Sequence, residues 1–274
     1  MYMGMDMDTD KGDTRKEPIK KRGKVYIVGS GPGDAGLLTI KALKAIQEAD
    51  VILYDRLVSE DVLALIPSHV ERVYVGREVG DDYKHQDATN RLMLKYASEG
   101  RCVVRLKGGD PFIFGRGGEE AEFLAEHGVE FEIVPGITSA IAVPAYAGIP
   151  LTHRAYSSSV AIVTGHEDAM KRTQTVDVAS VARAVDTLVV LMGVSSLKDM
   201  VHRLLESGMA GDTGIAIIEY GTVQGRQRVT ISSIGHVLDH AGDVRPPAVI
   251  VIGRVVQLAE RLRWYRGGEY RYFR

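Results

Sequence analysis

Between residues 24 and 134, short apolar stretches alternate with segments whose apolar residues recur at helical spacing. The apolar stretches lie at 25–28, 51–54, 72–75, 102–106 and 131–134, and the helical segments at 37–46, 61–66, 89–98 and 118–127. Strands that alternate with helices build a mostly parallel sheet with helices on both faces. The pattern therefore predicts an α/β domain, which we place at residues 24–148.

A second unit follows a break at residues 148–152. Strands are predicted at 160–164, 187–192, 215–220, 227–231 and 248–252, with a helix at 197–207. The stretch 227–231 alternates polar and apolar residues, which is typical of an antiparallel, half-exposed strand. We therefore expect a second α/β domain with a mixed sheet over residues 149–260.

The two ends of the chain differ from the predicted domains. Residues 1–23 lack apolar periodicity and are rich in charge, so we expect a disordered leader. Residues 261–274 form a basic aromatic tail that holds five arginines and five aromatic side chains. For this tail, a frayed end or a contact with a partner is favoured over nucleic-acid binding.

Composition excludes several classes of protein. The 45% apolar and 26% charged residues are typical of a globular chain, and no apolar run reaches the length of a membrane span, so we expect a cytoplasmic protein. The single cysteine argues against a disulfide framework, and the absence of an HExxH motif argues against a protein-bound metal. Residues 25–260 hold 22 basic and 30 acidic side chains, and this net charge of −8 argues against a nucleic-acid surface.

Four loops that follow predicted strands are candidates for a ligand site: GSGPGD, YDRLVS, KGGDPF and PGITSA. Ligands of parallel sheets bind beyond the carboxyl ends of the strands, so the four loops would share one site. The first loop has the GxGxxG spacing of a dinucleotide-binding turn, with Asp50 or Asp55 as the ribose acid. Because Pro32 lacks an N–H, this loop is a poor phosphate cradle, and an ordinary strand-to-helix turn is the alternative. An NAD-dependent dehydrogenase would rest on this spacing alone.

Two of the other loops also allow two interpretations. The paired glycines Gly108 and Gly109 let a ligand approach the backbone closely. The Asp110 carboxylate would accept hydrogen bonds from a ligand, or it would cap the following turn. Thr138 and Ser139 offer two hydroxyl groups, with simple helix capping as the alternative.

Charged side chains near these loops indicate acid–base chemistry and anion binding. Asp55 ends an apolar strand, where partial burial would suit a base; a cap or a salt bridge to Arg56 is the alternative. Arg116 with Glu119, and also Arg154, would suit a ligand with several carboxylates, because guanidinium binds carboxylate in a bidentate way. The other interpretation of both arginines is an ordinary solvated position.

Taken together, these segments resemble the tetrapyrrole methylase family, and within it the uroporphyrinogen-III C-methyltransferases. The run VGSGPGDAGLLTIKALKAIQEADVILYDRLVS is similar to the opening of these enzymes, and RLKGGDPFIFGRGGEEAEFLAEHGVEFEIVPGITSAIAVPAYAGIPLTHR is similar to their middle. LVVLMGVSSL and IEYGT are similar to their second half, so the resemblance covers roughly residues 24–258. Other tetrapyrrole methylases are less similar in YDRLVS and GGDPFIFGRGGEE.

The resemblance implies a fold, a reaction and a set of site residues. It implies two α/β domains with the active site in the cleft between them, a homodimer, and S-adenosyl-L-methionine as the methyl donor, released as S-adenosyl-L-homocysteine. The reaction would be C-methylation of uroporphyrinogen III at C2 and C7 to give precorrin-2, for sirohaem and cobalamin biosynthesis. The implied cofactor contacts are Pro32, Gly108, Gly109, Asp110, Ile113, Thr138, Ser139, Met192 and Gly221. Arg116, Glu119 and Arg154 would contact the substrate. Asp55 would accept a proton.

One departure from the family pattern concerns a proton donor. After VYVG the family has Lys-Arg, whereas this chain has Arg77 and Glu78. Arginine stays charged near neutral pH and is a poor acid, so we expect Arg77 to supply positive charge only. Two alternatives to the implied reaction are methylation of a later corrin precursor and binding of a tetrapyrrole without turnover.

Overall fold

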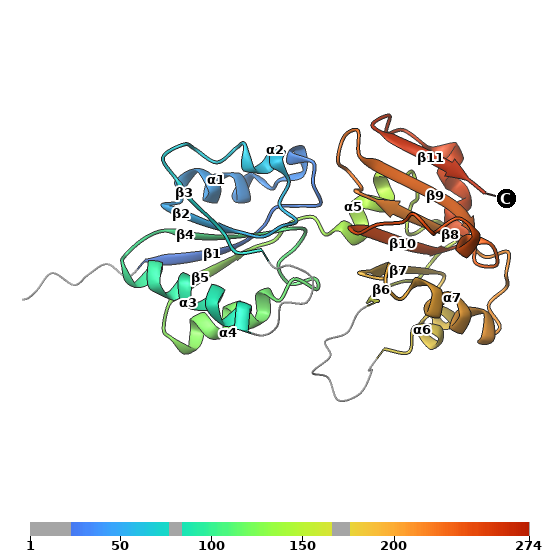
Figure 1. The fold of residues 1–274 in the computed structure, drawn as a ribbon, viewed down its shortest axis with the longest axis horizontal. Coiled ribbons are helices and arrows are strands. Elements are labelled where there is room, and N and C mark those ends of the chain that lie inside the picture. Colours follow the sequence, from blue (N-terminus) through green and yellow to red (C-terminus); the bar gives the residue numbers. More distant parts are fainter. Residues whose placement is uncertain (1–22, 77–83, 166–175, 274) are drawn as a thin grey trace, which may run out of the picture.

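The computed structural model describes residues 23–76, 84–165 and 176–273, and it contains two β-sheets, one in each half of Figure 1. The first is a 5-stranded parallel sheet in the order β3-β2-β4-β1-β5. Its strands are β1 Lys24–Gly29, β2 Val51–Tyr54, β3 Glu71–Tyr74, β4 Val103–Lys107 and β5 Glu130–Val134. The predicted parallel α/β arrangement is confirmed.

Helices cover both faces of this first sheet. They are η1 Ala35–Leu37, α1 Ile40–Glu48, α2 Glu60–Leu63, α3 Lys84–Ser98 and α4 Gly117–Glu126. Helices α1 and α2 pack on one face, where Ile46 and Ile52 are fully buried, and α3 and α4 pack on the other, around Met93 and Leu124 (Figure 1). Strands that are covered on both faces are apolar on both, which explains uninterrupted runs such as VILY.

Local sequence explains where several helices begin. The side-chain oxygens of Thr39, Ser59 and Asp177 each accept a hydrogen bond from a backbone amide in the first turn of α1, α2 and α6. These residue types are preferred at helix starts because they satisfy N–H groups that have no partner within the helix.

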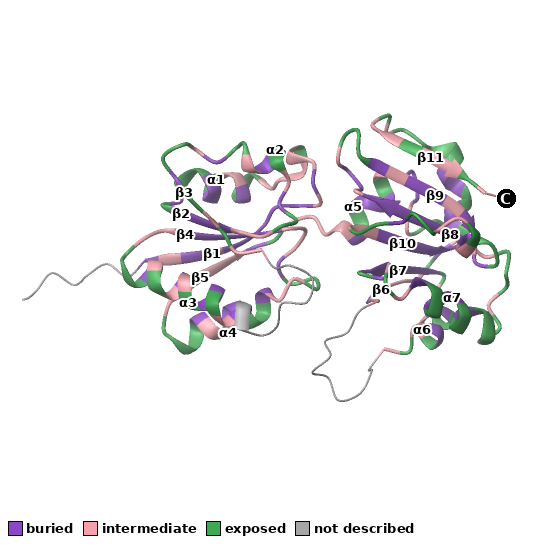
Figure 2. Ribbon diagram, viewed as in Figure 1, coloured by how far each residue is buried: buried purple, intermediate pink, exposed green. Residues whose placement is uncertain are grey.

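The second sheet has six strands and a mixed arrangement, as predicted. The order is β11-β9-β8-β10-β7-β6, and β10 runs antiparallel to both β7 and β8. The strands are β6 Val160–Thr164, β7 Thr187–Leu191, β8 Gly214–Glu219, β9 Gln227–Ser233, β10 Ala248–Gly253 and β11 Gly268–Tyr272. Figure 2 shows β7 and most of β10 buried along their length, as expected for the middle of a covered sheet.

Helices also cover both faces of the second sheet. They are α5 Ser139–Tyr146, α6 Val178–Ala184, α7 Leu197–Glu206 and α8 Ala259–Leu262, with the 3-10 helices η2 Val237–Asp239 and η3 Arg254–Leu258. Helices α6 and α7 share one buried cluster with the sheet, and α5 and η3 share another. The boundary between residues 148 and 149 stays a prediction. Helix α5, which precedes it, packs on the second sheet.

Two expectations about the second half are wrong. Strand β9 is antiparallel to β8, as predicted, but none of its residues is exposed, and β11 pairs with its other edge. Residues 268–272 are not a frayed end: they form β11, which pairs in parallel with β9 from Gln227 to Ile231. The sequence pattern also missed α5 and α6. The predicted disordered leader lies outside the described residues, except for Gly23.

In the described part of the chain, no helix combines the length and the apolar character needed to cross a membrane.

We expect Leu124→Ala to destabilise the first sheet, because Leu124 on α4 is fully buried. Loss of the transfer free energy and creation of a cavity should lower the free energy of unfolding by about 2–5 kcal/mol. Urea denaturation measures this change. Leu65→Ala, at a side chain that is 41% exposed, is the matched control. A loss no larger than that of the control would contradict the packing described here.

Candidate active site

The loops after β1 and β4 are joined by backbone hydrogen bonds. The Ser30 amide donates to the Lys107 carbonyl at 2.7 Å. Gly31 and Gly109 exchange two further bonds: the Gly109 amide donates to the Gly31 carbonyl at 2.7 Å, and the Gly31 amide donates to the Gly109 carbonyl at 3.2 Å. Two of the four loops singled out in the sequence therefore form one surface at the carboxyl edge of the sheet.

The loop after β5 joins them through a close approach of three backbones. A Cβ atom built on Gly29 would lie 2.5 Å from the Gly109 carbonyl oxygen and 2.6 Å from the Gly136 amide nitrogen. A Cβ on Gly136 would lie 2.3 Å from the same carbonyl oxygen. Only glycine fits at these two positions, and the result is an edge made of backbone groups. We call these three loops, at residues 29–34, 107–112 and 135–139, the backbone cradle.

Two predicted cofactor contacts use their side chains to hold the cradle. Asp110 Oδ1 accepts from the Phe112 amide at 2.8 Å, and Asp110 Oδ2 accepts from the Gly136 amide at 3.1 Å. The Thr138 hydroxyl accepts from the Ala140 amide at 3.3 Å and caps α5. The capping alternatives are therefore what the structure shows for both residues. Contact of either side chain with a cofactor stays a prediction.

A loop of the second sheet reaches the first loop of the cradle. The Asp34 amide donates to Thr222 Oγ1 at 3.2 Å. A Cβ on Gly33 would lie 2.8 Å from Val223 Cγ2 and 3.8 Å from the Gly221 carbonyl oxygen. The structure therefore brings Gly221, two residues past the end of β8, to the loop that contains Pro32.

Two further predicted cofactor contacts are exposed apolar side chains. Ile113, in the loop before α4, is 41% exposed, and Met192, directly after β7, is 49% exposed. Met192 also has a left-handed backbone, with φ of 55°. Strands β7 and β8 both run antiparallel to β10, so Met192 and Gly221 lie at the same edge of the second sheet.

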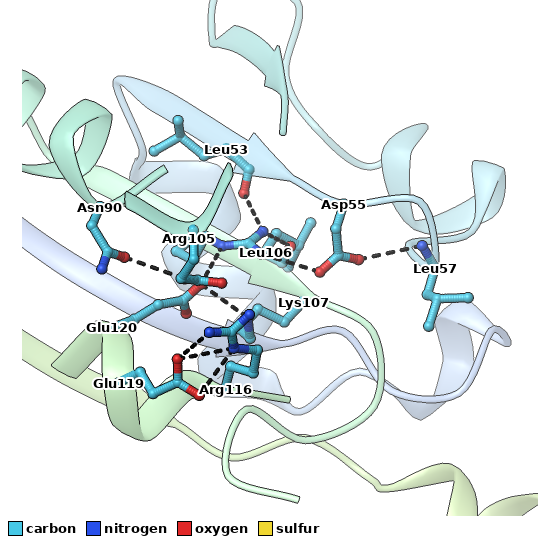
Figure 3. Close-up of polar contacts among 11 residues, drawn as sticks. Leu53, Asp55, Leu57, Asn90, Arg105, Leu106, Lys107, Arg116, Glu119 and Glu120 are labelled. Atoms are coloured by element: carbon cyan, nitrogen blue, oxygen red, sulfur yellow. Dashed lines mark hydrogen bonds and ion pairs between the residues drawn. The ribbon is translucent and has the colours of Figure 1, made fainter. Parts of the chain in front are cut away.

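Asp55 lies beside the cradle and is tied to a buried arginine. Asp55 Oδ2 is 3.3 Å from Arg105 Nη2, and Asp55 Oδ1 accepts from the Leu57 amide at 3.3 Å (Figure 3). Leu57 in turn packs on the cradle, because a Cβ on Gly108 would lie 2.7 Å from Leu57 Cβ. In the described residues, the ion-pair partner of Asp55 is Arg105 and not the neighbouring Arg56.

A buried carboxylate, Glu120 on α4, is the centre of this charge cluster. Glu120 Oε1 accepts from Arg105 Nε and from Lys107 Nζ, both at 3.0 Å, and from Gln86 Nε2 at 3.1 Å. Figure 3 shows the arginine and the lysine converging on it from β4. Burial by itself raises the pKa of Glu120, but the two cations outweigh burial and hold that pKa below its usual value. Burial, reinforced by Arg105, lowers the pKa of Lys107.

The sequence reasoning missed this buried charge cluster, although one signal was present. Arg105 and Lys107 are two residues apart in the strand VVRLK, so they lie on the same face of a sheet that is otherwise apolar there. Two charges on one face of a covered strand require a buried counter-charge. The pattern did not reveal that Glu120 supplies it.

The predicted substrate contacts lie in different places. Arg116, at the start of α4, donates through Nε to both carboxylate oxygens of Glu119 at 2.9 Å (Figure 3). Arg154 is exposed in a turn that is closed by bonds between His153 and Ser157, and within the described residues no hydrogen bond or ion pair joins its side chain to the cradle. Arg77, the expected positive charge, lies outside the described residues.

A family model described as tetrapyrrole (corrin/porphyrin) methylases matches residues 24–238. The chain belongs to the tetrapyrrole methylase family. This match confirms the resemblance that the loop motifs indicated. It covers all of the first sheet and reaches through β9 to the 3-10 helix η2 in the second half.

Solved structures of relatives have the same fold. A uroporphyrin III C-methyl transferase from Thermus thermophilus is 43% identical with a TM-score of 0.74, and the alignment covers 86% of this chain and 100% of that one. A structure of the Thermus protein complexed with S-adenosylhomocysteine aligns with the same values. A cobalt precorrin-4 methyltransferase is 29% identical with a TM-score of 0.76, over 88% of this chain and 98% of that one.

Curated relatives are longer proteins. The siroheme synthase of Enterobacter sp. (strain 638) is 48% identical over 249 residues, which are 91% of this chain and 54% of that protein. The siroheme synthase of Actinobacillus succinogenes is 49% identical over 243 residues, which are 89% of this chain and 50% of that protein. The chain thus spans about half the length of the curated relatives it matches.

Removal of the central negative charge is expected to destabilise the buried cluster. Glu120→Gln leaves Arg105 and Lys107 without their shared counter-charge, so the free energy of unfolding should fall by about 3 kcal/mol. Urea denaturation measures the change. Glu119→Gln, on the same helix but with a half-exposed side chain, is the control and should cost less than about 1 kcal/mol. Equal losses in the two variants would argue against a special role for the buried carboxylate.

Proposed function

We propose that this chain is an S-adenosyl-L-methionine-dependent C-methyltransferase that methylates uroporphyrinogen III at C2 and C7 and forms precorrin-2. The observation that carries the proposal is the backbone cradle, which lies beyond the carboxyl ends of parallel strands and is met by a loop of the second sheet. Family membership supports a tetrapyrrole as substrate. The Thermus relative supports uroporphyrinogen III and an S-adenosyl cofactor.

The cradle fits S-adenosyl-L-methionine. Its glycines bring backbone N–H and C=O groups of three loops to one edge. Ile113, directly after the second of these loops, and Met192, at the end of β7 in the second sheet, both expose apolar side chains. We propose as cofactor contacts the full predicted set of Pro32, Gly108, Gly109, Asp110, Ile113, Thr138, Ser139, Met192 and Gly221. When bound, the cofactor supplies a methyl group on a sulfonium, which is a good leaving group.

The chain's own contribution to methyl transfer would be mainly alignment. Asp110 and Thr138 order the backbone turns of the cradle, so its binding groups are held in place before a ligand arrives. Such preorganisation lowers the entropic cost of bringing the attacking carbon into line with the methyl group and sulfur. The pyrrole carbons of the substrate are electron-rich, so this alignment is sufficient without a metal ion.

Arginines are proposed to bind the eight carboxylates of the substrate. Glu119 fixes the orientation of the Arg116 guanidinium at the start of α4, next to the loop that carries Ile113. Arg154 is exposed in the second half of the chain. Guanidinium groups at two separate places suit a wide macrocycle with carboxylates around its rim.

Asp55 is proposed to accept the proton that the ring system loses after methylation. Arg105 orients its carboxylate, and the buried Glu120 in turn binds Arg105, so the side chain that positions the proposed base is itself held by a buried partner. Arg77 is proposed to supply positive charge near the substrate. We further propose that the protein is a cytoplasmic homodimer.

Methylation of a later corrin precursor is a second candidate function. The observation in its favour is the cobalt precorrin-4 methyltransferase, whose TM-score of 0.76 is slightly above that of the Thermus relative. Its lower identity of 29% makes it the weaker guide to the substrate.

An anaerobic assay with uroporphyrinogen III and labelled S-adenosyl-L-methionine tests the reaction. We expect a product that is heavier by two methyl groups, identified by mass spectrometry. A product with one methyl group would contradict double methylation and would direct attention to Arg77. If no methyl group is transferred although the protein binds S-adenosyl-L-methionine, methylation of a later corrin precursor would be favoured.

Replacement of the proposed base separates chemistry from cofactor binding. Asp55→Asn keeps the shape of the side chain but not its basicity, so kcat should fall by about 100-fold or more. The dissociation constant for S-adenosyl-L-homocysteine should stay within about twofold, because Asp55 is not among the proposed cofactor contacts. Steady-state kinetics and calorimetry measure the two quantities. Asp61→Asn, at an exposed position on α2, is the control. An equal loss of kcat in that variant would contradict the assignment of Asp55 as the base.

A further inference from the structure

The C-terminal segment at residues 262–270 lies beyond the family match and has no part in the proposed reaction, yet it packs against the end of α5. Trp264 Nε1 donates to the Ala145 carbonyl at 2.8 Å, and the Tyr270 hydroxyl donates to the Tyr146 carbonyl at 3.1 Å. The ring centroids of Trp264 and Tyr265 both lie 4.9 Å from that of Tyr146. The segment therefore contacts both the backbone carbonyl and the ring of Tyr146.

Backbone packing continues this contact beyond α5. Gly148 has a left-handed conformation, with φ of +73°, and a Cβ atom there would lie 2.8 Å from the Leu262 carbonyl oxygen. The C-terminal segment thus lies directly on the chain that leaves α5. Any displacement of the segment would remove support from both Tyr146 and Gly148.

Tyr146 connects this contact to the first loop of the cradle. Its hydroxyl donates to Asp34 Oδ2 at 2.8 Å, and Asp34 Oδ1 accepts from the Gly36 amide at 2.7 Å. Burial, together with the neighbouring Asp34, raises the pKa of Tyr146 to about 12. The hydrogen bond holds the turn that contains Pro32 and Gly33.

A second path runs from the segment to the same aspartate. Gly268 of β11 pairs with Gln227 of β9, and a Cβ on Gly268 would lie 3.1 Å from Gln227 Cβ. Gln227 Oε1 accepts from the Thr222 amide at 2.9 Å, and Thr222 Oγ1 accepts from the Asp34 amide at 3.2 Å. The Asp34 carboxylate is therefore held by Tyr146, which touches the C-terminal segment. The Asp34 amide is held by Thr222, which Gln227 connects to the same segment.

We propose that Tyr146 is a positioning residue for the cofactor and that residues 262–270 hold it in place, so that the C-terminal segment sets the affinity of the first cradle loop for the S-adenosyl ligand. The proposal rests on the proposed function of that loop. It gives the basic aromatic tail a role in cofactor binding within the same chain, in place of a frayed end.

Tyr146→Phe tests the proposal, because it removes the hydrogen bond to Asp34 and keeps the ring between Trp264 and Tyr265. The dissociation constant for S-adenosyl-L-homocysteine, measured by calorimetry, should rise about tenfold, as expected for loss of a hydrogen bond to a carboxylate. In the methyl-transfer assay, KM for S-adenosyl-L-methionine should rise while kcat at saturation is retained. Tyr272→Phe is the matched control, because Tyr272 lies just past the segment. The dissociation constant of this variant for S-adenosyl-L-homocysteine should be unchanged.

Trp264 offers a second measurement, because it is the only tryptophan of the sequence. Titration of the wild-type protein with S-adenosyl-L-homocysteine should change its fluorescence with the calorimetric dissociation constant. In Tyr146→Phe the amplitude of that change should fall. If the wild-type protein and Tyr146→Phe bind S-adenosyl-L-homocysteine with equal affinity and show the same fluorescence change, the role of Tyr146 is overturned, and the cofactor assignment still stands. Absence of binding to the wild-type protein would overturn the cofactor assignment and this proposal with it.

Discussion

The close approach of three backbones at the carboxyl ends of β1, β4 and β5 is the constraint on which the rest of the arrangement depends. A side chain at Gly29 or Gly136 would collide with the Gly109 carbonyl, so the strands can end together only with glycine at these positions. This contact brings the Gly136 amide within reach of Asp110 and places the start of α5 beside Gly109. The proposed binding edge is therefore built from backbone, and the side chains of Asp110 and Thr138 hold its turns.

Helix α5 joins this edge to the second sheet. It begins at the Thr138 cap in the cradle, packs its apolar side chains on the second sheet, and ends at Tyr146. The hydroxyl of Tyr146 returns to Asp34 in the first loop. One short helix thus contacts the cradle at both of its ends, which explains why loops from separate sheets keep a common geometry. The C-terminal segment stabilises the far end of the same helix.

The buried charges beneath Asp55 follow a different principle. Burying ions in a covered sheet is unfavourable unless each finds a partner of opposite charge. Glu120 neutralises Arg105 and Lys107 together, and Arg105 extends to Asp55 at the rim. In general, a buried ion cluster adds no more to stability than well-packed apolar side chains of similar volume. Its effect is to give the proposed base a single orientation.

Most of the fold could be predicted from the sequence, and part of the site could not. The alternation of apolar and helical segments correctly predicted the parallel first sheet, the mixed second sheet and the loops that follow the strands. It did not decide whether Asp110 caps a turn, because the second amide that it binds lies 26 residues away. It missed Glu120 as a counter-charge and β11 as a strand, since each depends on a partner from another element.

The sequence by itself determined most of the strands and helices, the loops that could bind a ligand, and the family, because periodicity, turn residues and motifs are properties of neighbouring residues. Tertiary structure alone decided that Arg105 and Lys107 share Glu120, that Asp34 is held by Tyr146 and Thr222, and that the tail lies on α5. These contacts join residues far apart in the chain, and their partners are set by how the sheets and helices pack.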